Sequence, residues 1–128
     1  MAEKIVTVSD LVETVKAIAK ERPRVVYVPR NHVEGCCYNK GMCSDNSIGC
    51  IFGQAFRRLG LVIEEAHDND SIEDAVRLLH LPNINRQVRL CQLIQGNQDS
   101  GFCWEQAVAD AEASFARELD HVDDDEHR

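Results

Sequence analysis

Apolar residues recur at helical spacing along most of the chain. From position 48 to position 59 they fall at i, i+3, i+4, i+7, i+8 and i+11, which makes one continuous apolar stripe on a helix. These residues are Ile48, Ile51, Phe52, Ala55, Phe56 and Leu59. Further stripes follow positions 11, 71, 85 and 104. The pattern predicts a mainly α fold, a compact bundle of about five helices.

Capping residues signal several helix boundaries. Thr7 and Asp10 match a capping box, in which each side chain accepts a hydrogen bond from the other residue's backbone N–H. Ser71 and Asp74 repeat this spacing, so a third helix is predicted to begin at Ser71. Gly60 stands where a residue in the left-handed conformation ends the second helix. Two starts stay open: Asn46 or Ser47 caps the second helix, and the fourth begins at Asn83 or Asn85.

Gly49 and Gly53 lie four positions apart and border the apolar stripe of the second helix. Glycine lowers helix stability by about 1 kcal/mol relative to alanine, so two of them here need another explanation. Without a Cβ atom, glycine allows a second segment to come unusually near. We therefore expect another backbone to approach this helix closely.

One short segment reads as β structure. Arg24–Val28 is rich in β-branched and aromatic residues and ends at a proline. A second strand is predicted at Cys36–Tyr38, joined to the first by a turn at Asn31–Gly35. The segment Asn39–Asn46 is predicted to be a loop because it is rich in turn-forming residues. The bundle therefore carries a minor β-hairpin.

The composition fits one small acidic domain. The chain has 128 residues, of which 44% are apolar, and a formal net charge of −8. Residues 1–119 are predicted to form a single helical domain, and residues 120–128 a disordered acidic tail. Because a uniformly acidic protein repels phosphate groups, the charge disfavours nucleic-acid binding.

The chain contains six cysteines, and their state depends on the compartment. No apolar run approaches the roughly 18 residues of a membrane-spanning helix. Residues 1–4 are not followed by the unbroken apolar stretch of a signal peptide. We therefore expect a cytoplasmic protein without membrane contact, in which thiols are more common than disulfides.

Four residues between positions 32 and 50 are candidate zinc ligands: His32, Cys37, Cys43 and Cys50. Tetrahedral zinc takes four such ligands, usually with cysteines two to four residues apart. The gaps here are longer than that. Cys36 and Cys37 are adjacent and would point to opposite faces of a strand, so only one of them could join a site. We expect reduced, metal-free cysteines and no cofactor.

Cys50 is the candidate nucleophile. It falls off the apolar stripe, in the predicted first turn of the second helix, where the helix N-terminus lowers the pKa of a thiol. A nucleophilic cysteine also needs a base, and no histidine is placed beside it by the sequence. The alternative is a structural thiol. The polar residues Gln54, Arg57 and Arg58 on the same helix are candidate binding residues.

A helix-turn-helix arrangement is a further alternative, because Arg77, Arg86 and Arg89 flank the connection between the third and fourth helices. That connection, residues 81–85, is long and lacks the glycine usual in such turns. The sequence also lacks the common nucleotide-binding, metalloprotease and serine-hydrolase motifs. A DNA-binding regulator is therefore the second alternative, and nothing positive indicates an enzyme.

Two blocks of the sequence resemble a family of small uncharacterised proteins of actinobacteria and their phages. The first block is Cys37-Tyr38, a polar loop, the run Gly49–Ala55 and Arg58–Leu61; the second is Gln98–Trp104 with Ala107-Val108. Gln54 replaces a histidine common in these relatives, so this chain lacks their Cys–His pair. The resemblance implies a cytoplasmic protein of phage or prophage origin and transfers no activity.

The leading functional hypothesis is a small protein-interaction module, a phage-encoded factor that binds a host protein. It rests on the missing catalytic motifs, the acidic charge and the resemblance. The alternative from another class is a Cys-dependent or metal-assisted enzyme centred on Cys50.

Overall fold

The computed structural model describes residues 6–28, 38–39, 42–68, 70–82 and 85–126, with the backbone alone at 85 and 119–126. Within these residues the order of elements is α1 (Val8–Glu21), β1 (Tyr27–Val28), β2 (Met42–Cys43), α2 (Ile51–Arg58), the 3-10 turn η1 (Glu65–His67), α3 (Ile72–Leu78), α4 (Asn85–Asp99) and α5 (Trp104–Glu126). The predicted mainly α fold with a minor hairpin is confirmed.

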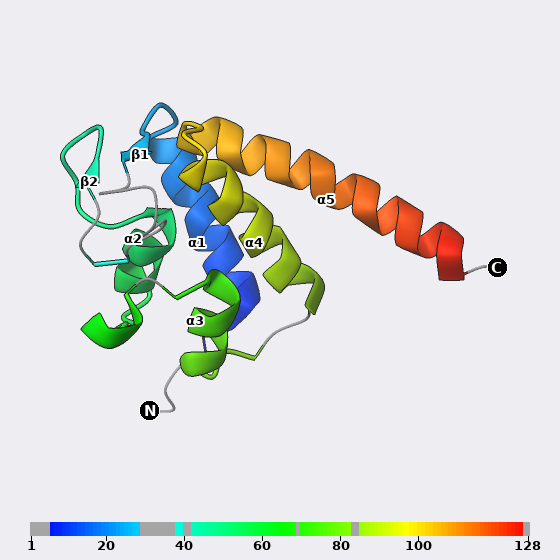
Figure 1. Ribbon diagram of the computed structural model, residues 1–128, viewed down its shortest axis with the longest axis horizontal. Helices are drawn as coiled ribbons and strands as arrows, with labels where there is room; N and C mark the ends of the chain where they lie inside the picture. The colour runs from blue at the N-terminus through cyan, green and yellow to red at the C-terminus, as the bar shows by residue number, and fades with distance from the viewer. Residues whose placement is uncertain (1–5, 29–37, 40–41, 69, 83–84, 127–128) are drawn as a thin grey trace.

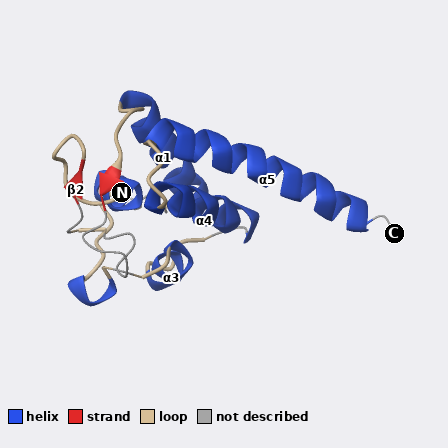
Figure 2. Cartoon of the chain, turned by 45° about the horizontal axis from the view of Figure 1, so that its top comes forward, coloured by secondary structure: helices blue, strands red, loops and turns tan. Residues whose placement is uncertain are grey.

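Helix α1 occupies the middle of the bundle (Figure 1). It contacts α2 on one side and both α4 and α5 on another, while α3 packs on α4. The core is formed by apolar side chains from all five helices and both strands. Its largest fully buried members include Trp104, Tyr27, Tyr38, Phe52, Phe56, Leu11 and Ile94. Figure 2 shows α5 extending well beyond the other helices.

The predicted capping residues occupy the predicted positions. Thr7 and Asp10 form the reciprocal pair of a capping box, with N···O distances of 3.0 and 3.1 Å. The Ser71 hydroxyl accepts the Asp74 N–H at the start of α3. Gly60 follows α2 with φ of +75°, a conformation that L side chains rarely adopt. These boundaries depend on local chemistry, which explains why the sequence predicts them.

Helix α2 begins later than predicted. Its N-cap is Cys50, rather than Asn46 or Ser47, and its first residue is Ile51. Ile48 therefore does not join the apolar stripe; its side chain is 52% exposed. The reason is Gly49, whose φ of +95° cannot continue a right-handed helix.

The second strand is also not where the sequence placed it. β1 pairs antiparallel with β2, with Tyr27 opposite Cys43 and Val28 opposite Met42. β2 lies within the predicted Asn39–Asn46 loop, and Tyr38 lies in a turn. The rest of the predicted strand, Cys36 and Cys37, falls outside the described residues. The pairing partner is a tertiary contact, which turn propensity does not reveal.

Two single bridges widen this small sheet. Val26 pairs with Cys103, just before α5, and Met42 pairs with Ile48. Beside the first bridge, the Trp104 N–H donates to the Val25 carbonyl at 2.9 Å, and the next N–H along the chain donates to the Pro23 carbonyl at 3.0 Å. The turn after α1 is therefore tied to the start of α5, far along the sequence.

Helix α5 is attached to α4 as far as Glu118. The Arg89 guanidinium binds the Glu118 carboxylate through both of its oxygens, at 2.7 and 3.1 Å. The backbone continues as helix to Glu126 and so includes residues 120–126, the start of the predicted tail. That the tail is mobile in solution, and that residues 1–119 form the domain, stay predictions. None of the described helices is long and apolar enough to cross a membrane.

Candidate functional site

The backbone of Tyr38 lies directly against Gly49 and Gly53, at and just before the start of α2. A Cβ atom on Gly53 would lie 2.0 Å from the Tyr38 carbonyl oxygen, and one on Gly49 would lie 2.3 Å from it. Neither distance is compatible with a side chain. The predicted close approach of another backbone is thus confirmed, and Tyr38 is the residue that makes it.

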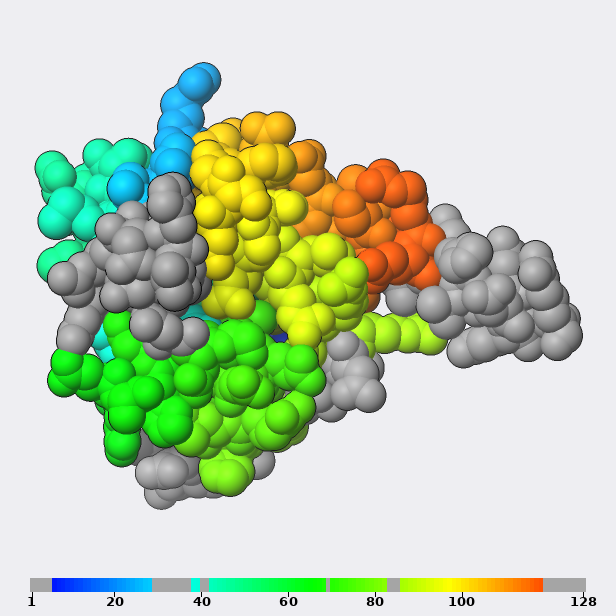
Figure 3. Space-filling view, in the orientation of Figure 1, coloured from blue at the N-terminus to red at the C-terminus, as the bar shows by residue number. Residues whose placement is uncertain are grey.

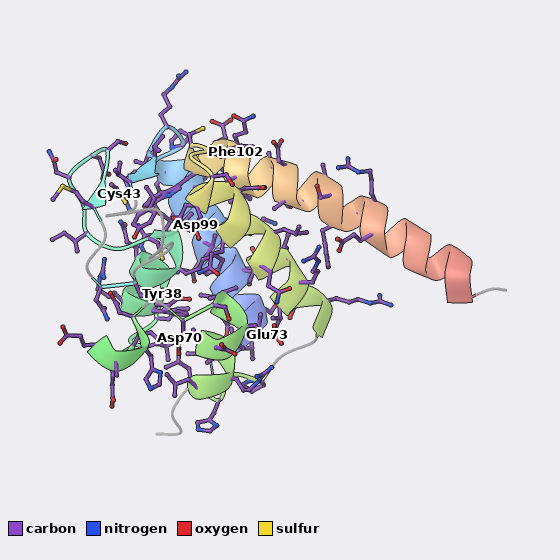
Figure 4. The ribbon with its side chains drawn as sticks, in the orientation of Figure 1. Tyr38, Cys43, Asp70, Glu73, Asp99 and Phe102 are labelled. Carbon is purple, nitrogen blue, oxygen red and sulfur yellow. The ribbon has the colours of Figure 1, made fainter. Side chains whose placement is uncertain are left out.

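The Tyr38 side chain is fully buried and satisfied. Its hydroxyl donates to the Asp70 carbonyl oxygen at 2.6 Å and accepts from Gln95 Nε2 at 3.2 Å. Its ring packs on Phe56 with the centroids 5.4 Å apart. Figure 4 shows Tyr38 close to Asp70. Burial raises the pKa of Tyr38. The phenol therefore stays neutral and anchors the chain instead of acting as a base.

Asp68 holds the Tyr38–Asn39 pair from the other side. Its backbone carbonyl accepts the Tyr38 N–H, and its Oδ1 accepts the Asn39 N–H at 2.7 Å. The Asn39 side chain reaches the Ile63 carbonyl at 2.8 Å. Asp68 is only 5% exposed, and its Oδ2 has no hydrogen-bond partner among the described residues. Asp68 therefore fixes the backbone of Tyr38 and Asn39, which precede β2.

Arg22 links four parts of the fold. Its guanidinium lies 5.0 Å from the centre of the Trp104 ring and 2.7 Å from Asp45 Oδ2, and it also binds Ser47 and Gln54. Hydrogen bonds from Ser47, aided by Arg22, hold the pKa of Asp45 below its usual value. The contacts tie the end of α1 to the 44–47 loop and to the start of α5.

Gln54 and Arg57, two of the candidate binding residues, hold the loop before α2. Gln54 is 8% exposed, and its amide nitrogen donates to Ser47 Oγ at 2.9 Å and to the Gly49 carbonyl at 3.2 Å. Arg57 donates to the Tyr38 carbonyl at 3.2 Å and to the Ile48 carbonyl. Their polar groups are used within the protein, which gives them a structural role.

Arg58, the third candidate, forms an ion pair between helices. Both guanidinium nitrogens bind the Glu21 carboxylate, at 2.9 and 2.6 Å. This hydrogen-bonded pair lowers the pKa of Glu21 and raises that of Arg58. Both side chains are about half exposed, so the pair adds little to stability. It connects the ends of α1 and α2.

Cys50 differs from the expected reactive thiol. Its side chain is fully buried, and its sulfur is engaged in a disulfide. The expectation that Cys50 is reduced is wrong. A sulfur engaged in a buried disulfide is neither a thiolate nucleophile nor a thiolate metal ligand. The position is structural, but as half of a disulfide and not as the structural thiol of the alternative.

The other cysteines of the described chain are thiols. Cys43 is buried, and its Sγ donates to the Gly49 carbonyl at 3.3 Å. Burial raises the pKa of the Cys43 thiol, and it raises that of Cys91, in the core of α4, to about 12. Of the proposed zinc ligands, His32 and Cys37 fall outside the described residues. Within them, no group of three or more His, Cys, Asp or Glu could hold a metal ion.

The disulfide should stabilise the fold measurably. A disulfide in a small domain typically contributes about 2–4 kcal/mol to stability. We expect reductant to lower the melting temperature of the native protein, and Cys50→Ser to have a similar effect. Cys103→Ser, at a free half-buried thiol, is the control. A melting temperature indifferent to reductant, or peptide mapping without a Cys50 link, would contradict the assignment.

Two buried glutamines of α4 accept hydrogen bonds from the first residues of other helices, a role that the sequence did not reveal. Gln95 Oε1 accepts the Ile72 N–H, the first of α3, at 3.0 Å. One turn later, Gln98 Oε1 accepts the Ile51 N–H, the first of α2, at 2.7 Å. Both glutamines are buried, and Gln98 is fully so. The signal available in the sequence is their spacing from Cys91, which places them on the apolar face of the helix.

Two of the three arginines of the alternative helix-turn-helix arrangement, Arg77 and Arg89, form ion pairs. Arg77 lies 2.9 Å from Glu73 and 3.5 Å from Asp74 on its own helix. Arg89 is held by Glu118 of α5. These exposed carboxylates partly offset the two positive charges and so reduce their attraction for phosphate groups.

An exposed apolar row crosses the hairpin. Val28, Met42 and Ile48 are neighbours across the three paired segments, and each is more than half exposed, at 55%, 54% and 52%. The alternate positions Tyr27 and Cys43 point into the core. Figure 3 shows the segment after β2 at the left edge of the molecular surface. We call Val28, Met42 and Ile48 the hairpin row.

Comparison with known proteins gives no match, whether with protein-family models, with curated proteins or with solved structures. The resemblance to small actinobacterial and phage proteins therefore stays a prediction. The function must be argued from the geometry alone.

Proposed function

We propose that the protein is a protein-interaction module, a phage-encoded factor that binds a host protein through the hairpin row. The observation that carries this proposal is the row itself. Cross-strand neighbours in an antiparallel sheet have Cβ atoms about 5 Å apart, so the three side chains form one continuous apolar strip. Isolated exposed apolar residues are common on protein surfaces, but contiguous ones mark interaction sites.

The residues around the row favour a rigid binding surface. Tyr38, Gln54 and Arg57 fix the loop that carries Ile48, and Arg22 fixes Asp45 and Ser47 beside it. A preformed surface loses less conformational entropy on binding. The partner we propose is a folded protein whose contact surface is apolar at its centre, because such a surface is complementary to the row.

The two alternatives have less support. An enzyme centred on Cys50 needs a reactive thiolate, and this sulfur is buried in a disulfide. A DNA-binding regulator needs unpaired cations on a recognition surface, and Arg77 and Arg89 are paired. The exposure of the hairpin row does not depend on the state of Cys50 or on the pairing of the arginines.

The test compares Met42→Glu with Val62→Glu. Val62 is 77% exposed and lies after α2, outside the row, so it is a matched control for adding a charge at an exposed apolar site. A partner captured from an actinobacterial lysate is identified, purified and titrated against each variant. We expect Met42→Glu to weaken binding by at least ~10-fold, because burying a methionine side chain is worth about 1.5–3 kcal/mol, and Val62→Glu to bind as the native protein does.

Circular dichroism checks that both variants remain folded. Equal binding by both variants would place the interface elsewhere. The absence of any specific partner would remove the proposal, as would self-association through the row as the only observed binding.

A further inference from the structure

Helices α1 and α5 together form a groove whose two walls have the same helical spacing. The α1 wall shows positions i, i+3 and i+4, which are Lys16, Ala19 and Lys20, and Pro23 joins it from the turn after the helix. The α5 wall repeats this spacing with Glu105, Val108, Ala109 and Glu112. Two packed helices present such faces to a third helix in a bundle. Within the described chain, no helix fills this position.

The floor of the groove is small and apolar. Ala19 and Val108 are nearly buried, and Pro23 and Ala109 lie beside them at the surface. The hollow that these side chains leave has a volume of about 390 Å³. Small residues at a helix contact let the axes approach to about 8 Å, the near end of the usual range. The groove is therefore suited to a convex apolar face, such as that of a helix.

The two walls carry opposite charges. Lys16 and Lys20 stand on the α1 wall, and Glu105 and Glu112 stand on the α5 wall. One contact crosses the groove, between Lys16 Nζ and a Glu112 carboxylate oxygen 3.6 Å away. The two side chains are 39% and 46% exposed, so this pair is weak and can be exchanged for contacts with an incoming group.

We infer that this groove binds an amphipathic α-helix of a partner protein, with acidic residues along one edge and basic residues along the other. The acidic edge faces Lys16 and Lys20, and the basic edge faces Glu105 and Glu112. The apolar face between the edges covers Ala19 and Val108. This surface is separate from the hairpin row, so the inference does not depend on the function proposed above.

A second copy of this chain is a poorer occupant. The part of α5 that extends beyond the bundle, residues 119–126, is the obvious candidate segment, but it contains five acidic residues and no lysine or arginine. Such a helix offers an acidic edge to the lysines and lacks the basic edge that the Glu105 wall requires. Charge complementarity thus favours a different protein.

The test uses three synthetic helical peptides with the same alanine–leucine face, titrated against the full chain by fluorescence anisotropy. One peptide has a glutamate edge and a lysine edge, the second has two lysine edges, and the third has two glutamate edges. We expect the mixed peptide to bind about tenfold more tightly than either of the others, since each like-charged edge replaces attraction with repulsion along one wall.

Charge reversal in the protein gives the sharper result. Glu105→Lys combined with Glu112→Lys makes both walls basic, so the preference should change to the peptide with two glutamate edges. Glu112→Lys alone should weaken the preference for the mixed peptide, and it spares the first turn of α5. Ala109→Phe, at an exposed position, should fill the groove and reduce binding of the mixed peptide at least fivefold.

Met42→Glu is the control that separates this inference from the proposed function, because it should leave peptide binding unchanged. Failure of every peptide to bind, or equal binding of all three, would overturn the inference. So would a concentration-dependent dimer that the double charge reversal abolishes, since the occupant would then be a second copy.

Discussion

Replacing Gly53 by alanine should lower the free energy of unfolding by more than about 3 kcal/mol. Overpacking of a core typically costs about 1–3 kcal/mol when side chains can shift. Here the new methyl group would meet the Tyr38 carbonyl oxygen at 2.0 Å and two further backbone atoms at 2.7 Å. Backbone held by Asp68 and Arg57 cannot move aside without breaking those hydrogen bonds, so the cost lies at or above the upper end.

Gly96 provides the matched control. It also lies in a helix, and a Cβ atom there would have no neighbour within 4 Å. Gly96→Ala should therefore stabilise the protein by about 0.5–1 kcal/mol through helix propensity and lower entropy of the unfolded chain. Urea denaturation of the two variants measures both values. The two substitutions are expected to act in opposite directions, and a neutral or stabilising Gly53→Ala would show that Tyr38 does not lie against α2.

Replacing Gln98 by leucine should cost about 4 kcal/mol. The Gln98 Oε1 atom accepts from both the Ile51 N–H, at 2.7 Å, and the Trp104 indole N–H, at 3.2 Å. Leucine has similar size but no acceptor, so two buried donors lose their partner. Each unsatisfied buried donor costs about 1–3 kcal/mol. The change should also expose the start of α2 to fraying, which hydrogen exchange at Ile51 would detect.

Gln92→Leu is the comparison for this substitution. Gln92 lies two turns earlier on α4, and its amide donates to Glu73 at the surface. Its loss should change the free energy of unfolding by less than about 0.5 kcal/mol. If the two variants melt at the same temperature, Gln98 does not have the capping role assigned to it.

Local signals allowed much of the fold to be predicted. The capping box at Thr7 and Asp10, the cap at Ser71 and the left-handed Gly60 depend on residues within one helical turn of each other. The sequence therefore located the start of α1, the start of α3 and the end of α2. It also indicated from Gly49 and Gly53 that a backbone must come close.

What could not be predicted depends on partners distant in sequence. The spacing of Gly49 and Gly53 predicts that another backbone lies close to α2, but only the fold identifies that backbone as Tyr38. Ile48 continues the helical period by coincidence, and its place is decided by Gly49 and by pairing with Met42. β2 has two residues, too few for a periodic pattern.

The binding role predicted for three polar residues of α2 stays a prediction. Gln54, Arg57 and Arg58 are polar residues on one helix, which is typical of a binding face. In the fold, their groups are taken up by the loop before α2 and by Glu21. The hairpin row was not anticipated, because it needs the register of strands that the sequence did not locate.

The bonds between the end of α1 and the start of α5 impose an order on folding during synthesis. The hydrogen bond to the Val25 carbonyl cannot form until Trp104 has been synthesised, roughly 80 residues later in translation. At about 5–20 residues per second, this wait lasts roughly 4–16 s. During it, the faces of α1 that α4 and α5 later cover remain accessible to chaperones on the ribosome. Synonymous codons that slow translation before Trp104 would lengthen this period without changing a single side chain.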